Sequence, residues 1–226
     1  TPEPGVADEV MFASMIPDLA ARAAYEPGSV ILDCEKRLLA LFARSFPDVT
    51  VKPSQMETKA GVTTAHYHWL KAIGGGNAAI EMGSLPRWLR SEISQFPKPN
   101  ANLVPDSTEQ THWKNIFGSA IGICWRSGKT GGGRNLQYAP LEAWASFIRE
   151  LPGQIVSVQY DAAGDEIATL QSLSGREILV TQGIDQKQEL DRACALLSSL
   201  DCVVSAPTAV SWLAAGAGVP AYKILY

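Results

Sequence analysis

The chain of 226 residues lacks both an excess of basic side chains and any long apolar segment. Its 19 Lys and Arg face 23 Asp and Glu, for a net charge of -4. Neither nucleic acid nor an anionic membrane surface is therefore expected as a partner. No apolar run reaches the roughly 20 residues that cross a bilayer, so we expect no membrane span. The first residues carry no signal-peptide pattern, and we predict a cytoplasmic protein.

Cysteine pairs and metal-ligand clusters are also missing. The four cysteines lie singly in apolar segments, which favours buried reduced thiols and excludes a disulfide framework. They are Cys34, Cys124, Cys194 and Cys202. His66 and His68 form a His-x-His pair, but no third ligand is evident. We predict no metal and no cofactor.

What the chain does have is a regular alternation of strand and helix patterns in its second half. Short apolar, β-branched segments alternate with segments whose apolar residues recur at helical spacing. Such alternation predicts a doubly wound parallel sheet with right-handed crossovers. The predicted strands are 120–125, 154–159, 176–181, 201–206 and 220–225, and the predicted helices are 140–151, 165–173, 187–200 and 208–217.

The first half is less regular. Helices are expected at 8–19, 35–46 and 86–93, and strands at 29–33, 49–52 and 80–82. The signals within 55–77 are mixed. Pro97, Pro99 and Pro105 indicate an extended connector over 97–118. We place an N-terminal domain at 1–117 and a C-terminal domain at 118–226. We expect the first strand of the N-terminal domain to be missing, because no strand pattern precedes the helix that begins after Gly5.

Several segments, in order along nearly the whole chain, resemble the bacterial heptosyltransferase-like glycosyltransferases, of the kind often fused to tetratricopeptide repeats. They are GVADEVMFAS at 5–14, CEKRLL at 34–39, RSFP at 44–47, MGSLPR at 82–87, IGICWRSG at 121–128, SVQY at 157–160, LDRA at 190–193 and SAPTAV at 205–210.

This resemblance implies an α/β protein of GT-B type with two Rossmann-like domains. It implies an inverting, metal-independent transfer of a sugar from a nucleotide-sugar to a protein or glycan acceptor. The donor would bind the C-terminal domain and the acceptor the N-terminal domain.

Candidate donor-binding residues follow three predicted strands. Ser205, Pro207, Thr208 and Ala209 lie between a strand and a helix N-terminus, where backbone N–H groups and the helix dipole favour a diphosphate. A helix cap explains Ser205 or Thr208 equally well.

The other donor candidates lie at the ends of two more strands. They are Arg126, Ser127 and Arg134 after the first strand and Gln159 and Tyr160 after the second. Cations there would offset the charge of a departing nucleoside diphosphate. A solvated basic loop and packing at the sheet end are the alternatives.

The resemblance places the catalytic base at Asp8, which would take a proton from the acceptor hydroxyl. A carboxylate in a first helical turn is also ordinary dipole chemistry. Gly5, Glu9 and Arg87 are the remaining candidates on the acceptor side.

Two donor-side positions depart from the family pattern. Pro207 precedes Thr208 where the family usually has Asp before Thr, and Trp212 stands where a His is expected. These departures favour an alternative, a non-catalytic binding or scaffold domain that has lost donor chemistry.

Overall fold

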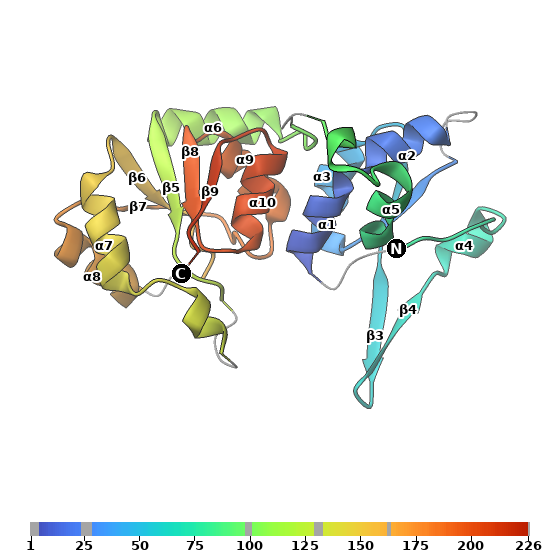
Figure 1. Cartoon of the computed structure of the whole chain (residues 1–226), viewed down its shortest axis with the longest axis horizontal. Helices are drawn as coiled ribbons and strands as arrows, with labels where there is room; N and C mark the ends of the chain where they lie inside the picture. Colours follow the sequence, from blue (N-terminus) through green and yellow to red (C-terminus); the bar gives the residue numbers. More distant parts are fainter. Residues whose placement is uncertain (1–4, 24–28, 98–100, 129–132, 162–163, 226) are drawn as a thin grey trace. The chain divides into compact units, whose positions relative to one another are not determined.

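The computed structural model describes residues 5–23, 29–97, 101–128, 133–161 and 164–225. The chain divides into two compact units, Thr1–Asn100 and Ala101–Tyr226 (Figure 1). Among the described residues, no helix has both the length and the apolar character to cross a membrane.

The second unit contains a five-stranded parallel sheet in the order β7-β6-β5-β8-β9. This result confirms the predicted parallel sheet. Its strands are β5 (Ala120–Cys124), β6 (Gln154–Ser157), β7 (Leu179–Val180), β8 (Cys202–Ser205) and β9 (Ala221–Lys223), and its helices are α6 (Ser107–Phe117), η4 (Arg134–Gln137), α7 (Leu141–Glu150), α8 (Gly164–Ser174), α9 (Leu190–Ser198) and α10 (Ala209–Gly216).

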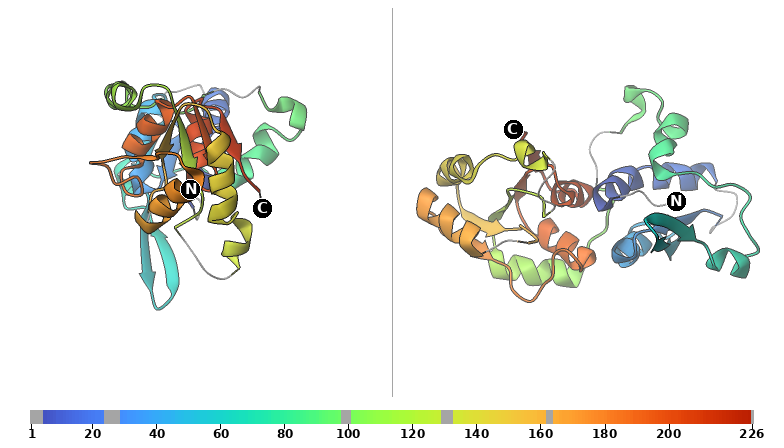
Figure 2. Two further views of the ribbon diagram at one scale, coloured as in Figure 1. Left: turned by 90° about the vertical axis from the view of Figure 1, so that its left-hand side faces the viewer. Right: turned by 90° about the horizontal axis from the view of Figure 1, so that it is seen from below.

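Helices cover both faces of this sheet (Figures 1 and 2). Helices α7 and α8 pack together on one face, and α9 packs against α6 and α10 on the other. The apolar residues of α7 recur at helical spacing, which buries Trp144 and Ile148 beside Ile123 and Ile155 of the sheet. This cluster packs α7 against β5 and β6.

The predicted extended connector contains a helix, so that part of the prediction was wrong. The prolines end at Pro105, and Asp106 then caps α6 by accepting hydrogen bonds from the backbone N–H groups of Thr108 and Glu109, both at 2.9 Å. The apolar face of α6 buries Trp113 and Phe117, which explains why the helix belongs to the second unit.

The first unit has a parallel strand pair and a long hairpin among its described residues. Its elements are α1 (Val6–Ala13), α2 (Ile16–Arg22), β1 (Ile31–Cys34), η1 (Lys36–Leu38), α3 (Leu39–Ser45), β2 (Thr50–Pro53), β3 (Gln55–Lys59), β4 (Val62–His66), α4 (Trp69–Ala72), η2 (Met82–Ser84), α5 (Leu85–Leu89) and η3 (Ile93–Gln95). Strands β1 and β2 are parallel, and β3 and β4 are antiparallel.

Two expectations for this unit need correction, and one undecided stretch is resolved. The helix expected at 8–19 is broken into α1 and α2, because Pro17 lies in the first turn of α2, where its missing N–H costs nothing. The strand expected at 80–82 is absent, since Met82 already begins a 3₁₀ turn that leads into α5 at Leu85. The mixed stretch forms β3 and β4, which turn at Ala60 and Gly61, with φ angles of 50° and 78°.

Candidate functional site

The order of the strands reverses between β5 and β8. From β5 the chain moves outward through β6 to β7, and it then returns to β8 and β9 on the other side of β5. Helices leave in opposite directions at such a point and open a crevice outside the carboxyl ends of the strands. Cys124 and Ser205, the last residues of β5 and β8, lie in register at this edge.

The carboxyl end of β8 leads into α10 through a buried hydroxyl pair. Ser205 is fully buried, and its Oγ lies 3.1 Å from Oγ1 of Thr208. Thr208 occupies the N-cap position of α10, but its side chain makes no capping hydrogen bond. The Sγ of Cys124 lies 3.7 Å from the same Oγ1. The first N–H groups of α10 therefore receive no acceptor from their N-cap side chain, and helix N-termini of this kind attract anions.

Pro207 and Ala209 flank Thr208 in this turn. Pro207 is exposed and Ala209 is half-buried. No acidic residue occupies the first turn of α10. Burial raises the pKa of the Cys124 thiol to about 11, so this neighbour is neutral at pH 7.

Gln159 fixes the loop that follows β5. Its side chain is 4% exposed, and its Oε1 accepts hydrogen bonds from the N–H groups of Trp125 at 3.0 Å and Arg126 at 3.1 Å. Its Nε2 donates to the carbonyl of Arg126 at 2.8 Å and to Oδ1 of Asp161 at 2.7 Å. All four capacities of one amide are used, which makes Gln159 a clamp on this loop.

Tyr160 holds the next part of the same loop. Its hydroxyl oxygen accepts a hydrogen bond from the N–H of Gly128 at 2.7 Å and lies 3.1 Å from Oγ of Ser127. Burial raises the pKa of the Tyr160 phenol, so the hydroxyl stays protonated at pH 7.

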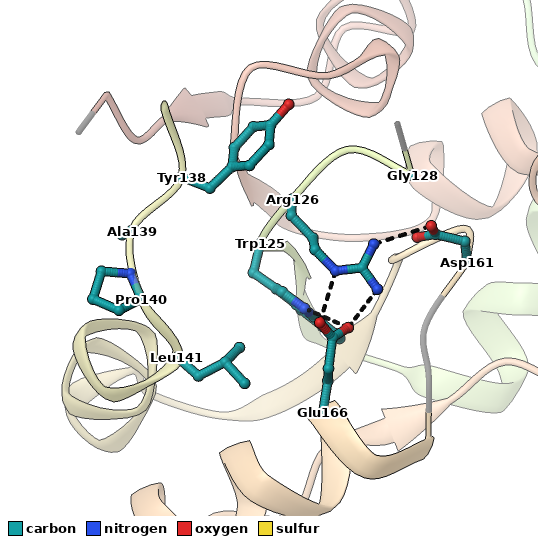
Figure 3. A pocket seen from close by; sticks show the side chains of 9 residues that line it. All are labelled: Trp125, Arg126, Gly128, Tyr138, Ala139, Pro140, Leu141, Asp161 and Glu166. Carbon is teal, nitrogen blue, oxygen red and sulfur yellow. Dashed lines mark hydrogen bonds and ion pairs between the residues drawn. The ribbon is translucent and has the colours of Figure 1, made fainter. Parts of the chain in front are cut away.

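Arg126 is paired with two carboxylates (Figure 3). Its Nε and Nη2 donate to the two oxygens of Glu166, both at 2.7 Å, and its Nη1 donates to Oδ2 of Asp161 at 3.0 Å. The hydrogen bonds that Arg126 donates, first to Glu166 and then to Asp161, raise the pKa of Arg126 above its ordinary value. Trp125 Nε1 also donates to Glu166 at 3.1 Å. One guanidinium faces two carboxylates, so this group has a net negative charge.

These side chains form one wall of a pocket of about 510 Å³. Tyr138, Pro140 and Leu141 line its opposite wall, before and at the start of α7 (Figure 3). A second pocket, of about 370 Å³, lies at the carboxyl ends of β6 and β7, where Ser157 and Thr181 contribute to its lining. Pockets of this size, with mixed polar and apolar walls, suit small organic ligands.

The first unit has its own group of carboxylates near the start of α1. Gly5 lies before α1, and its carbonyl accepts from the N–H groups of Asp8 at 3.0 Å and Glu9 at 3.1 Å. Asp8 is exposed. Glu9 is 1% exposed, and its Oε2 accepts from the N–H of Glu35 at 2.9 Å. Burial raises the pKa of Glu9 to about 7. Asp33 of β1 is also buried, and neither of its oxygens has a hydrogen-bond partner among the described residues.

The remaining predicted residues are less informative. Arg87 is exposed in α5 and lies over the ring of Trp88, with 5.7 Å from its guanidinium carbon to the ring centroid. The side chain of Arg134 lies outside the described residues. His66 and His68 stack at 5.5 Å, but the described residues include no group of three His, Cys, Asp or Glu that could hold a metal ion.

Comparisons with known proteins identify the fold. No protein-family model matches the chain. Protein FlbA of Caulobacter vibrioides is 33% identical over 99% of this chain, but the chain spans only 38% of that protein. The solved structure of the E. coli ADP-heptose LPS heptosyltransferase II matches 97% of this chain and 82% of that one, with a TM-score of 0.59 and 15% identity. The chain has a heptosyltransferase fold. E. coli heptosyltransferase WaaC, solved with ADP-2-deoxy-2-fluoro heptose, gives a TM-score of 0.39 at 12% identity over 91% of this chain and 64% of that one.

Within this heptosyltransferase fold the predicted donor residues fall into two groups. Ser127, Gln159 and Tyr160 meet around the loop after β5, together with Arg126. Ser205 and Thr208 meet at the start of α10.

Sequence reasoning missed Asp161 and Glu166. An acidic residue just after the second strand of a doubly wound sheet is a known signal, and Asp161 fits it. The partnership of Glu166 with Arg126 had no signal in the sequence, because it depends on how α8 packs beside the loop.

Proposed function

We propose that this protein is a glycosyltransferase that moves a sugar from a nucleotide-sugar to an acceptor. The heptosyltransferase fold, which extends over 97% of the chain, supports this proposal. The E. coli protein of that fold is named for ADP-heptose. For this chain we propose a nucleotide-sugar as the donor and a protein or a glycan as the acceptor. A cytoplasmic location stays a prediction.

The donor is proposed to bind the second unit. The observation that carries this assignment is the start of α10, which lies at the switch point between β5 and β8 and has no capping side chain. Here the diphosphate accepts hydrogen bonds from backbone N–H groups, while Ser205 and Thr208 shape the turn. The pockets at the ends of β5 and β6 would receive the sugar and the nucleoside. Asp161, after the second strand, suits a ribose hydroxyl.

The transfer itself is proposed to invert the anomeric centre and to need no metal. Asp8, exposed in the first turn of α1, takes the proton of the acceptor hydroxyl as that oxygen attacks the anomeric carbon. Glu9 is an unsuitable substitute because its carboxyl is buried against Glu35.

The test of this proposal compares two aspartate variants of the full chain. Asp8→Asn should lower sugar transfer by roughly 10²- to 10⁴-fold while nucleotide binding is unchanged. Asp48→Asn, at another exposed aspartate of the same unit, is the control and should leave transfer unchanged. Equal transfer by Asp8→Asn and the parent chain would remove Asp8 from the mechanism.

One observation favours the alternative of a binding domain without transfer activity. Arg126, a predicted phosphate ligand, is already paired with Asp161 and Glu166. Less of its positive charge is therefore available to the diphosphate of a donor. That alternative would be established if the chain binds a nucleotide but neither transfers the sugar of any nucleotide-sugar in a panel nor hydrolyses it.

A further inference from the structure

Lys223 lies at the edge of the sheet where the donor is proposed to bind. It is the last residue of β9 and stands in register with Ser205 of β8. Adjacent strands are about 4.8 Å apart, so Lys223 is one strand from the hydroxyl pair of Ser205 and Thr208. Ile224 N–H donates to the carbonyl of Ser205 at 2.9 Å, which continues the pairing past the end of β9.

The ammonium of Lys223 is held in place by an aromatic ring. Its Nζ lies 3.3 Å from the centroid of the Trp212 ring, in α10. A cation over an indole face is attracted by the π-electrons of the ring. Trp212 follows Thr208 by four residues, or about one helical turn of 5.4 Å. The ammonium therefore lies over a residue that is about one turn beyond the start of α10.

The charge of Lys223 is not neutralised by a carboxylate in the described part of the chain. No ion pair joins Lys223 to an Asp or Glu there, whereas Arg126 is paired with both Asp161 and Glu166. Lys223 is exposed, and desolvation by neighbouring atoms lowers the pKa of its ammonium. A cation in this state gains more from an anionic ligand than a fully solvated lysine does.

We infer that Lys223 is a cation that binds the diphosphate of the nucleotide-sugar, with Trp212 as its positioning residue. This inference rests on the proposed function. In the transfer, the bond from the anomeric carbon to the diphosphate oxygen breaks and its electron pair stays on that oxygen. The acceptor oxygen forms the new bond, and its proton passes to the base. Lys223 stabilises the negative charge that builds on the departing nucleoside diphosphate.

The experiment measures binding by titration calorimetry of the full chain with a panel of nucleoside diphosphates and with the matching nucleosides. Lys223→Met removes the charge and keeps a flexible stem, and Lys223→Arg keeps the charge. Trp212→Leu removes the ring. Lys187→Met, at an exposed lysine of the same unit, is the control.

We expect Lys223→Met to weaken the binding of the nucleoside diphosphate by roughly tenfold or more, which corresponds to the loss of one hydrogen bond to a charged group. The nucleoside itself should bind as before, which a general loss of structure would not allow. Lys223→Arg should retain most of the affinity for the nucleoside diphosphate. Trp212→Leu should weaken the binding of the nucleoside diphosphate but not that of the nucleoside. Lys187→Met should match the parent chain.

Two results overturn the inference in different ways. If the parent chain binds a nucleoside diphosphate and Lys223→Met binds it equally well, the inference fails and the proposed function stands. If the folded parent chain binds no nucleoside diphosphate, the proposed function fails and the inference with it. Should Lys223→Met not fold, as judged by circular dichroism, Lys223→Gln replaces it under the same criteria.

Discussion

Gln159 ties the ends of β5 and β6 together through one buried amide. It contacts the backbone of Trp125 and Arg126 and the side chain of Asp161. The residues that face the larger pocket thus take their positions from a side chain that lies beneath the loop rather than in the pocket. A sequence-based interpretation of Gln159 as a ligand residue stays a prediction, whereas its hydrogen bonds give it a clear positioning role.

The change Gln159→Leu removes these hydrogen bonds at similar volume. The N–H groups of Trp125 and Arg126 are left without their acceptor, which should lower the free energy of unfolding of the second unit by about 2–4 kcal/mol. Urea unfolding followed by tryptophan fluorescence measures the change. The exposed Gln182→Leu serves as the control. An unchanged unfolding midpoint in Gln159→Leu would show that water replaces the amide.

Glu9 should make the first unit less stable as the pH rises. Burial, the largest cause, and the nearby charges of Glu35 and Asp33 raise its pKa from 4.5 to about 7, against a lowering by the hydrogen bond from Glu35 N–H. Between these two values the folded state keeps a proton that the unfolded state has lost. The contribution of Glu9 to the free energy of unfolding is therefore greatest below about pH 4.5. It falls by about 3 kcal/mol as the pH rises through 7.

Glu9→Gln tests this expectation, because its amide oxygen can still accept from Glu35 N–H without any charge. The urea midpoint of the parent chain should drop between pH 5 and pH 8, and that of Glu9→Gln should drop less. Asp33, whose pKa burial also raises, contributes with the same sign and remains in both chains. Parallel pH profiles for the two chains would contradict a titrating Glu9.

At the scale of elements, α6 depends on its N-cap residue, Asp106, which the prediction of an extended connector from the prolines did not take into account. Asp106 accepts from two backbone N–H groups of the first turn. Asp106→Ala should lower the free energy of unfolding by about 1 kcal/mol. Thermal unfolding by circular dichroism measures it. Ser107→Ala, one residue on, is the control and should have a smaller effect. Equal melting temperatures for Asp106→Ala and the parent chain would argue against the cap.

Apart from α6, the strands and α-helices of the second unit could be predicted because strand and helix patterns alternate regularly along this part of the sequence. Alternating β-branched strands and amphipathic helices such as α9 have short connections, and parallel pairing follows from that rhythm. The ends of the elements could not be predicted as well. Strand β7 was expected over 176–181 but spans only Leu179–Val180, the two residues that pair with Val156 and Ser157 of β6.

The hairpin of β3 and β4 shows why the first unit was harder to predict. All five residues of β3 are exposed, so the strand has no buried face. Its sequence therefore lacks the alternation of apolar and polar residues that marks a half-buried strand. The turn at Ala60 and Gly61 was the available signal, and Ala is an uncommon residue at a positive φ. The hairpin also projects from the rest of its unit, as Figure 1 shows, so no core contact marks its strands in the sequence.

At the scale of the whole molecule, the second unit contains the candidate donor site and the first unit contains the candidate base. The ordered segments of the sequence pointed to the glycosyltransferase fold, and the similarity to heptosyltransferase II confirms that fold. The candidate site could be predicted only in outline. Strand ends marked Gln159, Ser205 and Thr208, but the ion pairs of Arg126 and the contact of Lys223 with Trp212 arise from packing between separate elements.

The most direct test of the proposed function is calorimetric titration of the full chain with nucleoside mono- and diphosphates of all common bases. We predict that one base is preferred and that its diphosphate binds more tightly than its monophosphate. Such a ligand should also raise the melting temperature of the chain in proportion to its affinity. A folded chain that binds none of these nucleotides would contradict the claim that its second unit holds a nucleotide-sugar.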